Sequence, residues 1–149
     1  MLIIAGAAKA MEQQADRLDL CFPGRVPRAH EYLFMETPLS QSKDWRKSPT
    51  GKSWVTNLVE LQAKLLAAAP HFDVALLSCG GYGLPLCAYI KHVLGKKAIY
   101  IGGALQLFFG VRGKRWDNEP EQMAFLNEHW IGNEVKPANW REIEGGAYW

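Results

Sequence analysis

The chain has 149 residues, of which 48% are hydrophobic and 21% are charged. This composition excludes a disordered or fibrous protein, and the length suits one domain with a buried core. The formal net charge of +2 is too small to indicate nucleic acid as a partner by itself.

The first half of the chain predicts two strands and two helices. Leu2 to Ile4 is an apolar, β-branched run, whereas the next segment has apolar residues at helical spacing. Ser53 or Thr50 would cap the second helix. The expected elements are a strand at 2–4, a helix at 7–18, a strand at 29–35, a polar loop at 36–51 and a helix at 54–69.

The second half alternates strands with glycine turns. Pro70 ends the preceding helix, and Gly95 would cap the end of the next one. After Gly110 the chain becomes more polar and then rich in aromatic residues. The expected elements are a strand at 72–77, a helix at 84–94, a strand at 97–101, a short helix after Gly103, a helix at 119–130 and an irregular tail at 131–149.

Uninterrupted apolar runs such as Val74 to Leu77 indicate strands that are covered on both faces, hence a parallel sheet. Helices between successive strands favour right-handed crossovers. We therefore predict a single α/β domain over residues 1–149, with a small doubly wound, Rossmann-like sheet of about four mainly parallel strands. Residues 118–149, the last helix and the aromatic-rich C-terminal tail, should pack back on this body.

Three cysteines, Cys21, Cys79 and Cys87, have no metal-type spacing, and we interpret them as small buried hydrophobes in a reducing compartment. The apolar N-terminal run lacks a basic n-region and is interrupted by Lys9, which indicates a first strand rather than a signal peptide. No apolar run approaches the ~20 residues of a membrane span. These features predict a cytoplasmic protein without a membrane span.

Two glycine turns are the main candidates for a binding site. Each follows a predicted strand and precedes a predicted helix, so both would bring backbone N–H groups and helix N-termini to one edge of the sheet, where α/β folds bind phosphate-bearing ligands. The alternative is that these glycines only permit tight turns with positive φ. The candidate residues are Gly80, Gly81, Tyr82 and Gly83 in the first turn, and Gly102 and Gly103 in the second.

A basic loop follows the second turn. Arg112, Lys114 and Arg115 could neutralise a diphosphate, and Trp116 could stack on a base or sugar. Gln106, on the intervening helix, could point its amide at a ligand. The alternatives are a solvated loop with Trp116 in the core and a purely structural hydrogen-bonding role for Gln106.

Other chemistries find no support in the pattern. The first glycine turn departs from the dinucleotide fingerprint, and Arg46 stands where a P-loop needs its first glycine. The histidines lack zinc-type spacing, and there is no nucleophile elbow and no acidic pair to hold a metal–diphosphate complex. Catalytic residues are therefore unknown, and Mn²⁺ or Mg²⁺ stays open as a cofactor with no ligand set visible.

The segments Cys79–Leu86, Lys97–Asp117 and Glu144–Trp149 together resemble the C-terminal part of bacterial proteins found with surface-polysaccharide genes. Some members of that group are labelled glycosyltransferases with a GT-D-like, Rossmann-type fold. Leu2–Pro23 is similar to their central strand and helix. Such proteins carry an acidic Gly-Asp-Gly-Glu-like motif in an earlier segment, and this chain shows no such motif.

The resemblance implies a nucleotide-sugar binding domain of glycosyltransferase type, acting in glycan or surface-polysaccharide biosynthesis. The alternative is a non-catalytic phosphate-ligand-binding or assembly module without the acidic catalytic half. A partner chain that supplies acidic residues would restore the enzyme reading, and a homo-oligomer stays open. RNA binding through the basic loop is disfavoured, because one loop makes a small electrostatic footprint.

Overall fold

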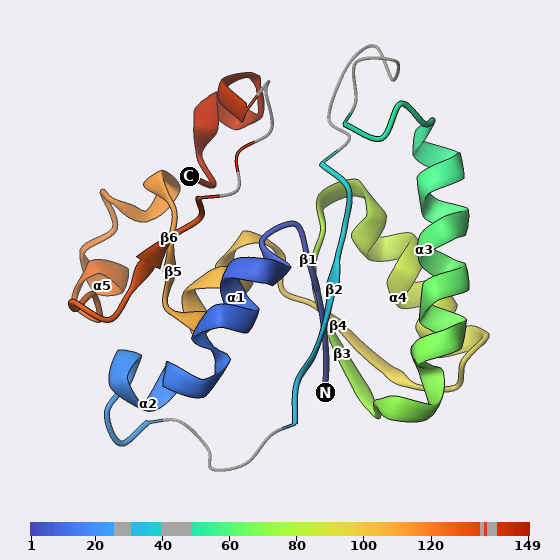
Figure 1. Cartoon of the computed structure of the whole chain (residues 1–149), viewed down its shortest axis with the longest axis horizontal. Helices are drawn as coiled ribbons and strands as arrows, with labels where there is room; N and C mark the ends of the chain where they lie inside the picture. Colours follow the sequence, from blue (N-terminus) through green and yellow to red (C-terminus); the bar gives the residue numbers. More distant parts are fainter. Residues whose placement is uncertain (26–30, 40–48, 135, 137–139) are drawn as a thin grey trace.

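The computed structural model describes residues 1–25, 31–39, 49–134, 136 and 140–149. Four parallel strands form one sheet in the order β2-β1-β3-β4 (Figure 1). The strands are β1 (Leu2–Ala5), β2 (Leu33–Glu36), β3 (Val74–Ser78) and β4 (Lys97–Tyr100). The predicted small α/β fold with a parallel sheet is therefore confirmed.

Helices cover both faces of this sheet (Figure 1). One face carries α1 (Ala8–Gln14), α2 (Leu18–Cys21) and the 3₁₀ helix Gly102–Phe109. The other face carries α3 (Trp54–Ala68) and α4 (Gly83–His92). Side chains along the central strands β1 and β3 point alternately into these two apolar layers, which is why these strands are almost wholly apolar. The edge strands β2 and β4 also carry exposed charged residues, Glu36 and Lys97.

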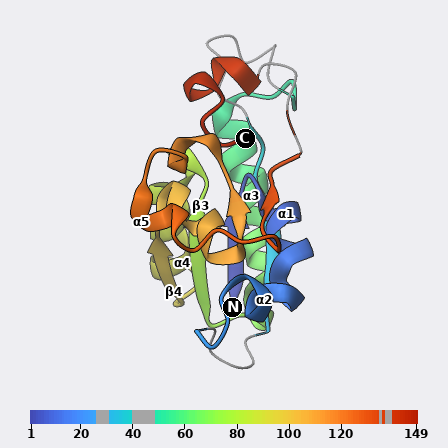
Figure 2. The same cartoon turned by 90° about the vertical axis from the view of Figure 1, so that its left-hand side faces the viewer.

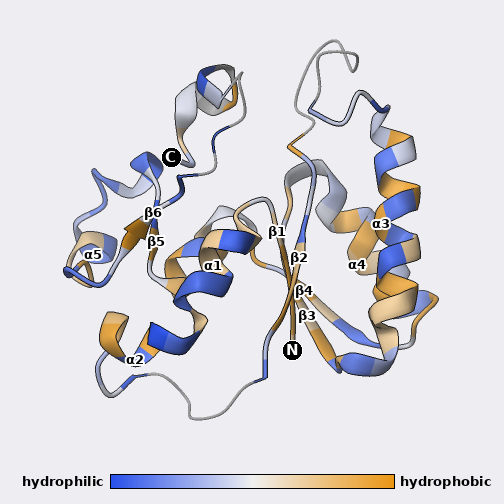
Figure 3. Ribbon diagram, in the orientation of Figure 1, coloured by the Kyte–Doolittle hydropathy of each residue, from blue (hydrophilic) through white to orange (hydrophobic). Residues whose placement is uncertain are grey.

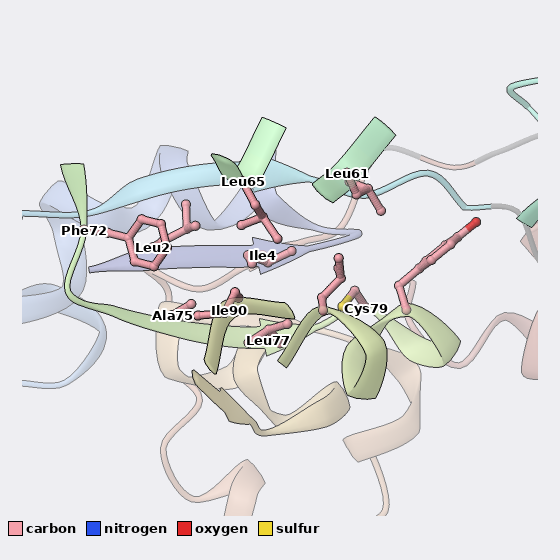
Figure 4. Packing of buried hydrophobic residues seen from close by; sticks show 11 residues of the cluster. Leu2, Ile4, Leu61, Leu65, Phe72, Ala75, Leu77, Cys79 and Ile90 are labelled. Carbon is pink, nitrogen blue, oxygen red and sulfur yellow. The ribbon is translucent and has the colours of Figure 1, made fainter. Parts of the chain in front are cut away.

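The alternation is clearest along β1. Ile4 packs with Leu65 and Ile90 under α3 and α4 (Figure 4), whereas Ile3 packs with Met11 under α1. All of these side chains are fully or almost fully buried. Figure 3 shows the result as apolar strands flanked by helices, such as α3, that carry both polar and apolar residues.

The order of the strands reverses between β1 and β3. From β1 the chain passes through α1 to β2 on one side, and from β3 it passes through α4 to β4 on the other. Right-handed crossovers in opposite directions require α1 and α4 to lie on opposite faces, as observed. The two strands pair in register from Leu2↔Ala75 to Ala5↔Ser78, so they end side by side.

Local signals placed most element ends correctly. Ser53 caps α3, because its Oγ accepts a hydrogen bond from the Thr56 backbone N–H at 3.1 Å. Thr50 instead accepts a bond from Asn57 Nδ2. The second strand begins at Leu33 rather than 29; residues 29 and 30, like 40–48 of the predicted loop, lie outside the described residues.

The predicted helix over 119–130 was wrong in length, since α5 covers only Pro120–Met123. Tertiary contacts explain the early end. Asn127 Nδ2 donates to the carbonyl oxygens of Leu20 and Cys21, and the ring of Trp130 packs edge-on against Phe22 at 5.3 Å. These contacts hold the segment that follows α5 against the end of α2, so the helix does not continue past Met123.

A second, two-stranded parallel sheet was not predicted. It pairs β5 (Val111–Arg112) with β6 (Ile131–Gly132), so the C-terminal region is not wholly irregular (Figure 2). Gln14 ties this sheet to α1, because its buried Nε2 donates to the carbonyl oxygens of Gly110 and His129 at 3.2 and 2.8 Å.

Nothing in the described ranges of the chain forms a helix of the length and apolarity that crossing a bilayer requires.

Gly110 should tolerate no side chain. Its φ is +65°, and an added Cβ would lie 2.6 Å from Cys21 Sγ. Gly95 has the same backbone conformation, φ +66°, but open space around it. We expect Gly95→Ala to lower the free energy of unfolding by about 1–2 kcal/mol through backbone strain. Gly110→Ala should cost about 1–3 kcal/mol more through overpacking. Urea unfolding of both variants measures the difference, and equal losses would contradict the packing described at Gly110.

Candidate functional site

A crevice of about 240 Å³ opens at the carboxyl ends of the strands, where the strand order reverses. Gly6 and Ala7, which follow β1, form one side, and Ser78 to Gly81, which end β3, form another. Open α/β sheets bind ligands at this type of position. The full lining is Gly6, Ala7, Thr37, Pro38, Leu39, Trp54, Ser78, Cys79, Gly80, Gly81, Tyr82, Tyr100, Gly103, Gln106, Asn133, Ile143, Tyr148 and Trp149.

The first glycine turn lies at this crevice. Gly80, Gly81 and Tyr82 line it. Gly80 needs to be glycine for its positive φ of +53°, and Gly83 for packing, because a Cβ there would lie 2.2 Å from the Tyr100 ring. Gly81 has neither requirement, and its missing side chain leaves space in the crevice.

The second glycine turn contributes one residue to the lining. Gly103 lines the crevice, whereas Gly102 has a φ of +73° and shapes the turn without lining it. A Cβ on Gly103 would lie 3.4 Å from both Arg115 Nη1 and the Tyr148 ring. The two predicted turns therefore meet at one site, as expected from neighbouring strands.

Aromatic side chains make up much of the crevice wall. The rings of Trp54 and Tyr82 stack with centroids 5.4 Å apart and planes within 4°. Tyr148 and Trp149, from the C-terminal segment, pack edge-on at 6.1 Å. Tyr100 Oη donates to the carbonyl oxygen of Gly80 at 3.4 Å. Walls of this kind suit flat or ring-shaped ligands.

Two buried side-chain amides also line the crevice. Gln106 is 3% exposed and Asn133 is 5% exposed. Gln106 Nε2 and Asn133 Oδ1 make no hydrogen bond to any residue that the structure describes. Gln106 therefore lines the crevice, and its Nε2 lacks the structural hydrogen bond of the alternative among the described residues.

The basic loop lies beside the crevice and not in it. Arg112 Nε is bonded to Asp117 Oδ1 at 2.9 Å, and Lys114 is exposed. The Arg115 guanidinium contacts a lining residue, because its Nη1 donates to Tyr148 Oη at 3.4 Å. The structure therefore brings Arg115 to the mouth of the crevice and leaves Arg112 and Lys114 outside it.

Trp116 belongs to a second cavity of about 610 Å³ on the α1 face of the sheet. This cavity is mainly apolar, with Phe108, Phe109 and Phe125 among its lining residues. Trp116, the residue predicted to stack on a base or sugar, therefore does not line the crevice.

The crevice lining carries no acidic, basic or histidine side chain among the described residues. Its one thiol, Cys79, is buried, and burial, with a smaller effect from Cys87, raises its pKa to about 12. Cys79 is therefore a neutral thiol and not a nucleophile at physiological pH. No group of three or more potential metal-ligating side chains occurs among residues with described positions.

Comparisons with protein-family models, with curated proteins and with solved structures gave no match to this chain.

Sequence reasoning missed several lining residues. Trp54 begins the helix after the predicted polar loop, to which no functional role was given. Asn133, Tyr148 and Trp149 come from the part of the chain expected to be an irregular tail. The only local signal was the concentration of aromatic residues near the C-terminus. The positions of Asn133, Tyr148 and Trp149 depend on the β5–β6 pair and on two backbone hydrogen bonds. In these bonds the N–H groups of Lys114 and Arg115 donate to the carbonyl oxygens of Trp149 and Ala147.

The raised pKa of Cys79 predicts a loss of stability at high pH. The unfolded thiol ionises near pH 9 and the folded one near 12, so the folded state loses stability as pH rises from 9 to 12. We expect a Cys21→Ala/Cys87→Ala protein to show a steeper decline in unfolding free energy between pH 9 and 11 than the same protein with Cys79→Ala added. Urea unfolding at each pH measures the slopes, and parallel slopes would show that Cys79 is accessible to solvent.

Proposed function

We propose that the crevice binds a nucleotide-sugar, with one ring of the ligand inside and the diphosphate at the mouth. The observation that carries this proposal is the meeting of two glycine turns at the point where the strand order reverses. In open α/β sheets this point is the usual ligand site.

The size and chemistry of the crevice decide which part of the ligand enters. Its volume of about 240 Å³ is below the range of about 300–1,000 Å³ for pockets that enclose a drug-sized ligand. The lining is uncharged and partly aromatic, so an uncharged ring, either the sugar or the base, suits it better than a diphosphate. Stacking of a base on an aromatic ring contributes about 1–3 kcal/mol.

The diphosphate would lie near Gly103 and Arg115. Gly103 allows close approach of the backbone, and the Arg115 guanidinium lies beside it. Arginine binds phosphate oxygens in a forked, charge-assisted geometry. The negative charge of the diphosphate would thus stay at the exposed mouth of the crevice, where the cost of desolvating it is low.

A role in glycan or surface-polysaccharide biosynthesis is the process that we propose for this binding, on the strength of the sequence resemblance described above. Sugar transfer would need a general base, and the described lining carries none at a useful pKa. This favours a second candidate, a non-catalytic binding or assembly module. Three exposed apolar residues support the assembly part of that candidate: Leu84 on α4, Val93 directly after α4, and Ile99 on the edge strand β4.

Binding is tested by thermal unfolding and by tryptophan fluorescence with UDP-, GDP- and CMP-sugars, with and without Mn²⁺. A ligand at about 100 times its Kd should stabilise the fold by about 2.7 kcal/mol. Trp54 and Trp149 line the crevice, so their emission should change on binding. The absence of any shift across the whole panel would refute the proposal. Hydrolysis or transfer assays on the ligand that binds separate the enzyme from the binding module.

Arg115→Gln should weaken nucleotide-sugar binding by about tenfold, or about 1.4 kcal/mol, because it removes the cation at the mouth. Arg112→Gln is the matched control, since Arg112 is in the same loop but paired with Asp117. We expect the control to bind like the wild type. Equal losses in the two variants would indicate that only the net charge of the loop matters.

A further inference from the structure

Gln106 and Asn133 reach the crevice from elements far apart in the sequence. Gln106 lies on the 3₁₀ helix Gly102–Phe109, and Asn133 directly follows β6. Arg112 pairs with Gly132 in the parallel register, so Gly113 and Asn133 are the residues that directly follow this pair. Gln106 Nε2 also lies against Gly113, 2.5 Å from where its Cβ would be. Glycine at this position makes room for the glutamine amide.

The two amides present opposite hydrogen-bonding groups. Gln106 Nε2 is an N–H donor and Asn133 Oδ1 is an acceptor, and neither has a partner within the described ranges. A buried polar atom without a hydrogen bond destabilises a fold, so most such atoms are satisfied. Two unsatisfied atoms of opposite type, both on residues that line one crevice, therefore point to a ligand that satisfies them.

We infer that Gln106 and Asn133 recognise a secondary amide group of the ligand, whose carbonyl oxygen accepts from Gln106 and whose N–H donates to Asn133. This inference rests on the proposed nucleotide-sugar site and specifies its ligand class. In a UDP-sugar, the group has two sources: the acetamido group of an N-acetylamino sugar, or the N3–H and carbonyl edge of uracil. Either one is an uncharged group that suits the uncharged lining.

For isosteric apolar variants, the inference predicts unchanged or higher stability together with weaker ligand binding. Gln106→Met and Asn133→Leu remove an unsatisfied buried group, so the free proteins should melt at the same temperature as the wild type or higher. The same variants should bind the amide-bearing ligand about tenfold more weakly, because the ligand amide then loses a partner. A residue that only supports the fold would show the reverse pattern.

Gln122→Met is the matched control. Its Oε1 is also buried without a partner among described residues, but Gln122 lines the second cavity on the α1 face. The substitution removes the same kind of atom at a different place. We expect it to leave the affinity of the crevice ligand unchanged.

Titration calorimetry with four probes tests the inference and separates the two sources: UDP-N-acetylglucosamine, UDP-glucose, UDP and N3-methyl-UDP. If the acetamido group enters, the wild type binds UDP-N-acetylglucosamine about tenfold more tightly than UDP-glucose, and Gln106→Met and Asn133→Leu lose this preference. If uracil enters, the two UDP-sugars bind alike, and N3-methylation weakens UDP about tenfold in the wild type only.

Two results would overturn the inference while leaving the proposed function intact. One is that binding to the wild type depends on neither the acetamido group nor the uracil N3–H. The other is that Gln106→Met and Asn133→Leu bind the ligand as tightly as the wild type does. A large fall in the melting temperature of the free variants would also overturn it, because the two amides would then be bonded to the fold or to each other. A wild type that binds none of the four probes would overturn the inference. If the GDP- and CMP-sugars also failed to bind, the nucleotide-sugar proposal would fall with it.

Discussion

The pairing of β1 with β3 is the constraint on which the rest of this molecule depends. The two strands are side by side in register, and their connections leave in opposite directions. Helices are therefore forced to opposite faces of the sheet, and no crossover covers the gap above the two carboxyl ends. The crevice is a consequence of this arrangement, with Gly6 and Ala7 on one side and the Cys79–Tyr82 turn on the other.

The sheet supplies only part of the site, and the C-terminal half of the chain completes it. Gln14 holds the start of β5 and the approach to β6 against α1, and the N–H groups of Lys114 and Arg115 bind carbonyl oxygens of the last residues. Through these bonds Tyr148 and Trp149 become a wall of the crevice, whereas Arg115 stays at its mouth. The basic loop and the aromatic tail thus form one unit, in which the tail contributes surface for a ring and the loop contributes charge.

The chemistry of this site differs from that of a phosphate cradle. An uncharged, partly aromatic interior suits a neutral ring better than a diphosphate, because desolvating a diphosphate there would be costly. Glycines have separate roles here: Gly80 and Gly102 permit the backbone of the turns, Gly83 accommodates Tyr100, and Gly81 and Gly103 line the crevice without adding side chains to it. The buried, protonated thiol of Cys79 adds shape rather than reactivity.

The sequence by itself determined the fold class, the approximate positions of the four main strands and the meeting of the two glycine turns, because hydrophobic periodicity and turn residues act over short stretches of chain. It also narrowed the cap of α3 to Ser53 or Thr50, and the structure decided for Ser53. Only the tertiary structure decided the short α5, the β5–β6 pair, the separation of Arg112 and Trp116 from the crevice, and the presence of Asn133 within it. These depend on contacts between residues far apart in the chain, such as the bonds from Asn127 to the end of α2, and such contacts leave no periodic pattern in the sequence.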